Sequence, residues 1–91
     1  MANEELAVLI QSGRRDLLLE LWQQVERFVR WKDDRLAQKL DGRYGVATED
    51  LYQCGFLALL VAVQSFRVDK ERSFIGWFDY SLWTEFAKLC G

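Results

Sequence analysis

Apolar side chains recur along the first part of the chain at the three- and four-residue steps of an α-helix. Asn3 precedes two glutamates, which is the pattern of a helix N-cap, and Gly13 is suited to end that helix in the left-handed conformation. A second apolar stripe begins after Arg14 and spans about 140° of a helical wheel. Its members are Leu17, Leu18, Leu21, Trp22, Val25, Phe28 and Val29. The pattern predicts a short helix through about Gln11 and then a longer helix with one buried face.

The middle of the chain is more polar and then becomes strongly apolar. Residues 32–47 predict a weak helical stretch to Leu40 and a loop marked by two glycines. Thr48 predicts the N-cap of a third helix that runs to about Phe66. Because Cys54–Val63 is apolar nearly all round, we expect this helix to be the central and most buried one.

A fourth helix is predicted from near Ser73 to near Leu89, after a charged connection. It has two apolar faces that lie opposite each other, each within about 120° of the wheel. One face comprises Phe74, Ile75, Phe78, Leu82, Phe86 and Leu89; the other comprises Trp77, Tyr80, Trp83, Thr84 and Ala87. The second face is either buried as well, or a stacking platform for bases, or a protein-binding hot spot, and spacing does not separate these. Glu85 falls within the first face and does not fit a core position, unless its carboxylate reaches solvent near the helix end.

These elements predict an all-α fold, a compact bundle of about four helices in one domain. The composition agrees, because 51% of the residues are apolar and there is no proline to interrupt a helix. Alternation typical of strands does not persist anywhere.

The composition also narrows the function classes. With no histidine and no carboxylates placed beside a nucleophile, we predict that the chain is not an enzyme and has no metal, cofactor or small-molecule substrate. The longest stretch without a polar side chain, Phe56–Val63, is far shorter than the roughly 20 residues that span a bilayer, so we expect no membrane partner. Cys54 and Cys90 form no disulfide framework, which predicts reduced core thiols in a cytoplasmic protein. The net charge of −2, without a basic stripe, is atypical of a duplex-DNA binder.

The start of the third helix carries a small polar patch. Asp50 and Gln53 are three residues apart and share a face, with Glu49 adjacent. The two acids also complement the positive end of the helix dipole, which is a purely structural role. Gly55 costs helix propensity and predicts the close approach of another helix.

The residues of this helix resemble a known family. The pattern Asp50-Leu-x-Gln-x-Gly-x-x-x-Leu-x-x-Ala-Val-x-x-Phe66 is similar to region 2 of bacterial RNA polymerase sigma factors of the sigma-70 family. The similarity continues from Asp69 to Phe74, and looser similarity covers the opening Asn3–Gly13 segment and Leu18–Val29.

The resemblance implies a helical domain whose third helix docks on the coiled-coil clamp helices of the polymerase β′ subunit. It assigns that contact to the start of the helix. The implied polymerase-binding residues are Glu49, Asp50, Gln53, Phe56 and Leu57. It also implies that residues 1–91 are a single domain from a longer sigma factor, in which a helix-turn-helix domain follows.

For the fourth helix the resemblance implies recognition of the promoter minus-ten element as melted, single-stranded DNA of the non-template strand. Trp77 and Tyr80 take the places of family aromatics that hold bases, and Thr84 and Ala87 lie further along the same face. The implied DNA-binding residues are Lys70, Arg72, Trp77, Tyr80, Trp83 and Thr84. The chain departs from the family at Ser81 and Trp83, where a second tryptophan and an arginine are usual. Asp79 and Glu85 add negative charge where phosphates would favour cations.

Two functional hypotheses therefore remain open. The first is a sigma factor-like initiation domain that binds core RNA polymerase and promoter DNA. The second is a polymerase- or partner-binding adaptor that has the same fold without promoter recognition. A purely structural bundle with buried aromatics is a third interpretation.

Overall fold

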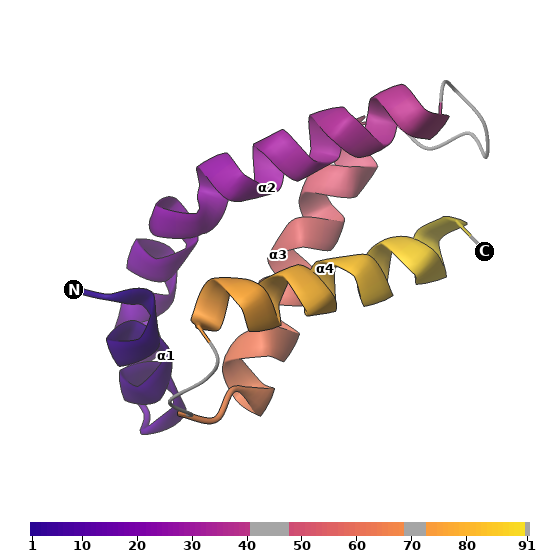
Figure 1. Ribbon diagram of the computed structural model, residues 1–91. Helices are drawn as coiled ribbons and strands as arrows, with labels where there is room; N and C mark the ends of the chain where they lie inside the picture. Colours follow the sequence, from indigo (N-terminus) through magenta and orange to yellow (C-terminus); the bar gives the residue numbers. More distant parts are fainter. Residues whose placement is uncertain (41–47, 69–72, 91) are drawn as a thin grey trace.

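The computed structural model describes residues 1–40, 48–68 and 73–90, in which the chain forms four α-helices and one short 3₁₀ helix (Figure 1). The helices are α1 (Asn3–Gln11), η1 (Arg15–Leu17), α2 (Leu18–Leu40), α3 (Thr48–Ser65) and α4 (Phe74–Cys90). The predicted all-α bundle is confirmed. The predicted loop around Gly42 and most of the charged connection, including Lys70 and Arg72, lie outside the described residues.

The turn after α1 forms as the glycine pattern predicts. Gly13 has a φ of 117°, a conformation that side chains other than glycine rarely adopt. Its N–H donates to the carbonyl of Ile10 at 3.0 Å, and the N–H of Arg14 donates to the carbonyl of Leu9 at 3.0 Å. These two bonds satisfy carbonyls of the last turn and reverse the chain into η1.

The predicted cap at the start of α1 is wrong by one residue. Asn3 is the first residue of the helix, and the cap is Ala2, whose backbone is extended and whose carbonyl accepts from the N–H of Leu6 at 3.1 Å. Glu5 reaches back and accepts from the N–H of Ala2 at 3.4 Å. The carbonyl that accepts the first helical hydrogen bond is that of Ala2 rather than that of Asn3. The helix therefore starts without a side-chain cap.

Helix α2 continues without a break through the polar stretch that follows its apolar stripe. Leu21, Trp22, Val25 and Val29 are buried, as predicted, and Leu36, about two turns after Val29, is half-buried. The continued burial of one face explains why the weakly helical residues remain in the same helix.

Helix α3 is the centre of the fold and packs against α1, α2 and α4. A Cβ atom built on Gly55 would lie 2.6 Å from Cγ1 of Val29, so the close approach predicted at this glycine is confirmed. The expectation that α3 is the central and most buried helix is confirmed, although Leu57 and Val61 on one side of it face solvent. No neighbouring helix covers that side within the described residues.

One apolar core joins all four helices. Its buried members are Leu6, Ala7, Leu21, Trp22, Val25, Val29, Leu51, Cys54, Ala58, Leu59, Ala62, Val63, Phe66, Phe74, Phe78, Leu82 and Phe86. The predicted core face of α4 packs on α3, and the rings of Phe66 and Phe74 meet edge-to-face with centroids 5.2 Å apart.

The N-terminus of α4 is capped from two places in the chain. The Oγ of Ser73 accepts from the N–H of Gly76 at 3.1 Å, which confirms the predicted start near Ser73. Glu4 of α1 accepts from the N–H of Phe74 through its carboxylate. Since α4 has no acidic residue in its own first turn, Glu4 supplies the negative charge that the helix dipole favours there.

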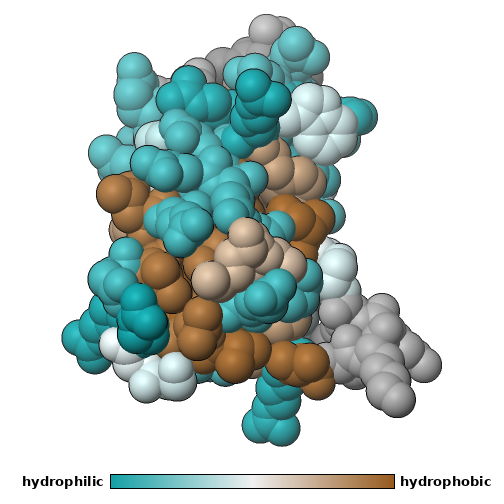
Figure 2. Space-filling view, turned by 90° about the vertical axis from the view of Figure 1, so that its left-hand side faces the viewer, coloured by the Kyte–Doolittle hydropathy of each residue, from teal (hydrophilic) through white to brown (hydrophobic). Residues whose placement is uncertain are grey.

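Figure 2 shows the end of the molecule that carries α1, where apolar side chains reach the surface among polar ones. Val8 and Leu19 are exposed. A groove of about 980 Å³ lies between α1, the start of α2 and the end of α3. In it the side-chain amide of Gln11 donates to the carbonyls of Val63 at 2.7 Å and Phe66 at 2.6 Å, so this groove contains a structural contact that closes the end of α3.

Candidate functional site

The solvent-facing side of α3 combines polar and apolar residues at helical spacing. Asp50, Gln53, Leu57 and Val61, which we call the α3 face, follow one another at steps of three and four residues and are all exposed. Leu57 is 55% exposed and Val61 is 47% exposed. The α3 face therefore combines an exposed aliphatic pair with a carboxylate and an amide on one side of the helix.

A hollow of about 330 Å³ extends the α3 face onto the end of α4. It is lined by Asp50, Gln53, Cys54, Leu57, Glu85 and Lys88. Glu85 and Lys88 form an ion pair at 3.3 Å, in which the glutamate side chain is largely buried and the lysine is exposed. The sequence signal for this extension was the misfit of Glu85 on the core face of α4, which the structure explains by this pair.

The structure brings together three of the five residues predicted to bind polymerase. Asp50, Gln53 and Leu57 line the same hollow. Phe56 is half-buried and packs edge-to-face on Trp22 with centroids 5.2 Å apart. Glu49 is exposed beside a different hollow, which Arg30, Asp33, Asp34 and Tyr52 also line.

The second face of α4 is largely exposed, so the interpretation in which both faces are buried is wrong. Tyr80 is 64% exposed, Trp83 is 50% exposed and Thr84 is exposed. Trp77 is half-buried; its ring stacks on Tyr80 with centroids 5.6 Å apart, and its Nε1 donates to Ser65 Oγ at 3.0 Å. The hydroxyl of Thr84 donates to the carbonyl of Tyr80 at 3.1 Å. We call Trp77, Tyr80, Trp83 and Thr84 the aromatic face of α4; within it the rings of Trp77 and Tyr80 are in contact.

The negative charge that α4 places beside this face is neutralised by α2. Asp79 forms an ion pair with Lys32 at 3.0 Å, and both side chains are partly shielded from solvent. The sequence of α4 alone gives no sign of this, because the cation lies in another helix.

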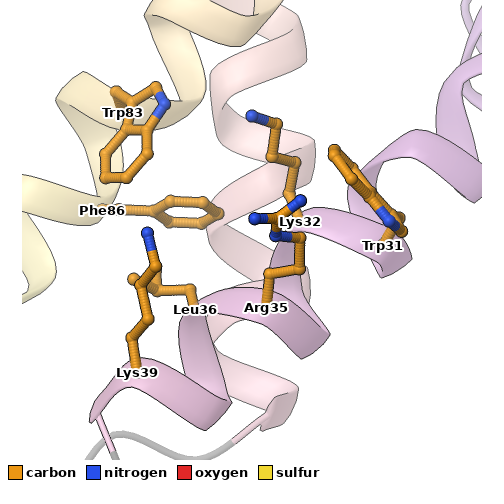
Figure 3. Close-up of a pocket in the computed structure, with 7 residues that line it drawn as sticks. All are labelled: Trp31, Lys32, Arg35, Leu36, Lys39, Trp83 and Phe86. Carbon is orange, nitrogen blue, oxygen red and sulfur yellow. The ribbon is translucent and has the colours of Figure 1, made fainter.

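A groove between the second halves of α2 and α4 adjoins the aromatic face. It has a volume of about 230 Å³ and is lined by Trp31, Lys32, Arg35, Leu36, Lys39, Trp83 and Phe86 (Figure 3). We call it the α2–α4 groove. Figure 3 shows Trp83 and Phe86 projecting from α4 toward the cationic side chains of α2. Arg35 lies over the ring of Trp31, 4.9 Å from its centroid, and Lys32 lies 5.8 Å from the centroid of Trp83.

Sequence reasoning missed the α2 side of this groove. The available signal was the interleaving of Trp31 with Lys32, Arg35 and Lys39 outside the apolar stripe of α2. Basic residues alternating with an aromatic are typical of nucleic-acid contacts.

Asp33 is a second unusual feature of α2. It is only 2% exposed, and its Oδ1 has no hydrogen-bond partner among the described residues. Burial raises the pKa of Asp33 to about 6, the charge of Asp34 acts in the same direction, and Arg30 opposes it. By contrast, the pKa of Glu26 is lowered because the hydroxyl of Tyr52 and the guanidinium of Arg30 both donate to its carboxylate.

Residues 1–40, 48–68 and 73–90 contain no group of three or more side chains placed to hold a metal ion. None of their helices combines the length and apolar content needed to cross a membrane. Cys54 is buried, as predicted.

The comparisons with known proteins give one match. The sequence profile of the family described as Sigma-70 region 2 matches residues 34–79, which is half of the chain. The matched range covers the end of α2, all of α3 and the first turns of α4. It includes the α3 face and Trp77, whereas Tyr80, Trp83 and Thr84 lie just beyond it. No curated protein and no solved structure matches the chain.

Proposed function

The chain belongs to the sigma-70 region 2 family, and from this premise we propose that it is a transcription-initiation domain that binds core RNA polymerase and melted promoter DNA. Residues 1–91 act as one binding domain of a bacterial, cytoplasmic transcription complex, without catalysis. The observation that carries the proposal is the exposed α3 face, which lies within the matched residues and which no other helix of the described chain covers.

Docking on polymerase uses the α3 face and the hollow beside it. The aliphatic pair Leu57 and Val61 supplies apolar area, at about 25 cal/mol for each Å² removed from water. Asp50 and Gln53 at one end, with Glu85 and Lys88 across the hollow, supply charged and amide groups that fix the register of a partner helix. A long helical partner such as the β′ clamp helices of polymerase offers a matching surface.

Binding of the purified domain to the β′ clamp helices tests the docking half. Leu57→Ala, Asp50→Ala and Gln53→Ala should each weaken the affinity, and Leu57→Ala by about tenfold or more, or roughly 1.4 kcal/mol. Leu19→Ala and Gln23→Ala are matched controls for Leu57→Ala and Gln53→Ala. They remove the same chemical groups from exposed positions on the first half of α2. If all three α3 variants bind the clamp helices with the affinity of the unmodified protein, docking through this face is rejected.

The promoter half of the proposal uses the aromatic face of α4, together with Lys70 and Arg72 outside the described residues. Exposed rings bind unstacked bases at roughly 1–3 kcal/mol each, and Tyr80 is the most exposed of them. Tyr80→Ala should therefore weaken binding of a single-stranded minus-ten oligonucleotide about five- to hundredfold, with little loss of stability. Trp77→Ala is a less clean variant, because Trp77 is half-buried and bonded to Ser65.

The adaptor without promoter recognition remains the second candidate. One observation favours it: the most exposed aromatic residues lie outside the family match. The adaptor predicts that the domain binds the clamp helices. Its affinity for a single strand should then be negligible and unchanged by Tyr80→Ala.

A further inference from the structure

We propose that the α2–α4 groove binds single-stranded nucleic acid, with a base against Trp83 and the phosphates against Arg35 and Lys39. The inference rests on the proposed function and deepens it, because it assigns the phosphate contacts of the bound strand to α2, a helix that the promoter-binding prediction did not include.

The apolar part of the groove suits an unstacked base. Trp31 on α2 is 50% exposed, as Trp83 on α4 is, and Leu36 and Phe86 add apolar lining between the two helices. In a duplex both faces of each base pair are covered by neighbouring pairs, so exposed indole rings gain little from it. A single strand presents free base faces, and stacking on them is the main source of sequence-tolerant affinity.

The charged part of the groove suits phosphate. Its lining contains three cationic side chains and no carboxylate, although the chain as a whole has a net charge of −2. Lys32 is already paired with Asp79. Arg35 and Lys39 are exposed and form no ion pair with any described residue, so both remain available to an anion.

The groove is continuous with the aromatic face of α4. Trp83 belongs to both surfaces; Tyr80 lies about one turn nearer the start of α4, and Thr84 directly follows Trp83. A strand whose bases lie on Trp77 and Tyr80 can therefore continue to Trp83 and bring its backbone to α2. With the rings on α4 and the phosphate-binding cations on α2, the acidic residues of α4 do not prevent it from contacting a nucleic acid.

The test measures binding of a labelled single-stranded DNA oligonucleotide by fluorescence anisotropy over a range of salt concentrations. The double variant Arg35→Gln/Lys39→Gln should bind about tenfold or more weakly at low salt. The slope of log affinity against log salt should fall by about 1.4, since each phosphate contact to a single strand contributes about 0.7. Trp83→Ala should lower affinity without changing the slope, because it removes stacking and not charge.

The matched control is Arg14→Gln/Arg15→Gln. It also removes two positive charges, from exposed positions in the turn and the 3₁₀ helix that precede α2, and Arg35 lies roughly 25 Å along α2 from Leu18 at 1.5 Å per helical residue. Affinity and slope should both equal those of the unmodified protein. Thermal unfolding of both double variants checks that neither has lost its fold.

Three outcomes would overturn the inference. An unchanged salt slope in Arg35→Gln/Lys39→Gln would show that the groove contacts no phosphate. The same loss with a duplex of the same sequence would assign the groove to duplex backbone. If Arg35→Gln/Lys39→Gln loses binding to an acidic peptide but keeps its affinity for the oligonucleotide, the groove is a protein-binding site.

The outcomes also separate this inference from the proposed function. If Tyr80→Ala weakens oligonucleotide binding while the Arg35/Lys39 variant does not, only the groove assignment fails. If the unmodified protein binds no single strand, promoter binding and the groove assignment fail together, and the clamp-helix assay decides polymerase docking independently.

Discussion

At the scale of single residues, Asp33 is the side chain whose environment most changes its chemistry. Its carboxyl group is buried on α2 beside Arg30 and Asp34, and Glu49 and Tyr52 of α3 line the same hollow. Its pKa in the folded protein is about 6, against an ordinary value of 3.8. Between these values the folded state binds a proton that the unfolded state has lost. The stabilisation from this protonation is therefore complete below about pH 4 and is lost as the pH rises through 6.

Asp33→Asn should remove this pH dependence. At pH 8 the variant should be more stable than the unmodified protein by about 1–2 kcal/mol. This is less than the full pKa shift of Asp33 implies, because the amide of the variant also stays buried. The difference in stability should shrink toward pH 5. Urea unfolding at several pH values between 5 and 8 measures it, above the range in which Glu26, whose pKa is lowered, titrates. Glu20→Gln, an exposed acid on the same helix, is the control. A difference that does not vary with pH would contradict the assigned pKa.

Gly55 is the second residue with a measurable role. An alanine there would place its Cβ 2.6 Å from Cγ1 of Val29, whose branched side chain is buried and has one preferred rotamer in a helix. Gly55→Ala should therefore destabilise the protein by about 1–3 kcal/mol, although alanine favours a helix by about 1 kcal/mol. Val29→Ala should cost less in the Gly55→Ala background than alone, with a coupling energy of about 1 kcal/mol or more in a double-mutant cycle. A coupling near zero would mean that the two helices adjust without a clash.

At the scale of elements, α4 depends on α1 for the stability of its first turn. Ser73 and Glu4 satisfy different N–H groups there, those of Gly76 and Phe74. Ser73→Ala and Glu4→Ala should each lower the free energy of unfolding by about 1 kcal/mol. Glu5→Ala is the matched control, because Glu5 is exposed and makes only a 3.4 Å contact with Ala2. If Glu4→Ala costs no more than Glu5→Ala, the contact between α1 and α4 contributes nothing to the helix end.

Local residue chemistry was enough to predict the elements. Gly13 predicts the end of α1 and Ser73 predicts the start of α4, each to within about a residue of the observed bounds. Both predictions succeed because turn and cap hydrogen bonds involve neighbours in sequence. The cap at Asn3 failed because Ala2, with no capping side chain, supplied the first helical carbonyl. The central position of α3 was predicted correctly, but the exposure of Leu57 and Val61 on one side of it was not. An apolar helix is buried only where another helix covers it. The sequence around Leu57 and Val61 does not indicate that this side of α3 is left uncovered.

At the scale of the whole molecule, the candidate site was predictable only where it lies on a single helix. Asp50, Gln53 and Leu57 share a face by spacing alone, and so do Tyr80 and Trp83. The pairing of Lys32 with Asp79, and the placement of Arg35 and Lys39 beside Trp83, join segments far apart in the chain. They depend on how α2 and α4 both pack on α3 and so come into contact with each other, which periodicity does not encode. The charge of one helix is therefore a poor guide to the surface it helps to form.

The two proposed surfaces lie on different sides of α4. Glu85 and Lys88 line the hollow beside the α3 face, whereas Trp83 and Phe86 line the α2–α4 groove. The helix between them is held by buried Phe78 and Leu82, so that a ligand on one side does not have to displace it. We therefore expect the domain to bind polymerase and a single strand at the same time and independently.

Crossed variants test this independence. Leu57→Ala should weaken clamp-helix binding and leave oligonucleotide affinity within about twofold, and Arg35→Gln/Lys39→Gln should do the reverse. The combined variant should show both losses added within about 0.5 kcal/mol, as for sites without shared contacts. Oligonucleotide affinity should also be the same with and without saturating clamp helices. A coupling above about 1 kcal/mol would instead mean that α4 shifts when polymerase binds, and that docking itself adjusts the surface that receives the strand.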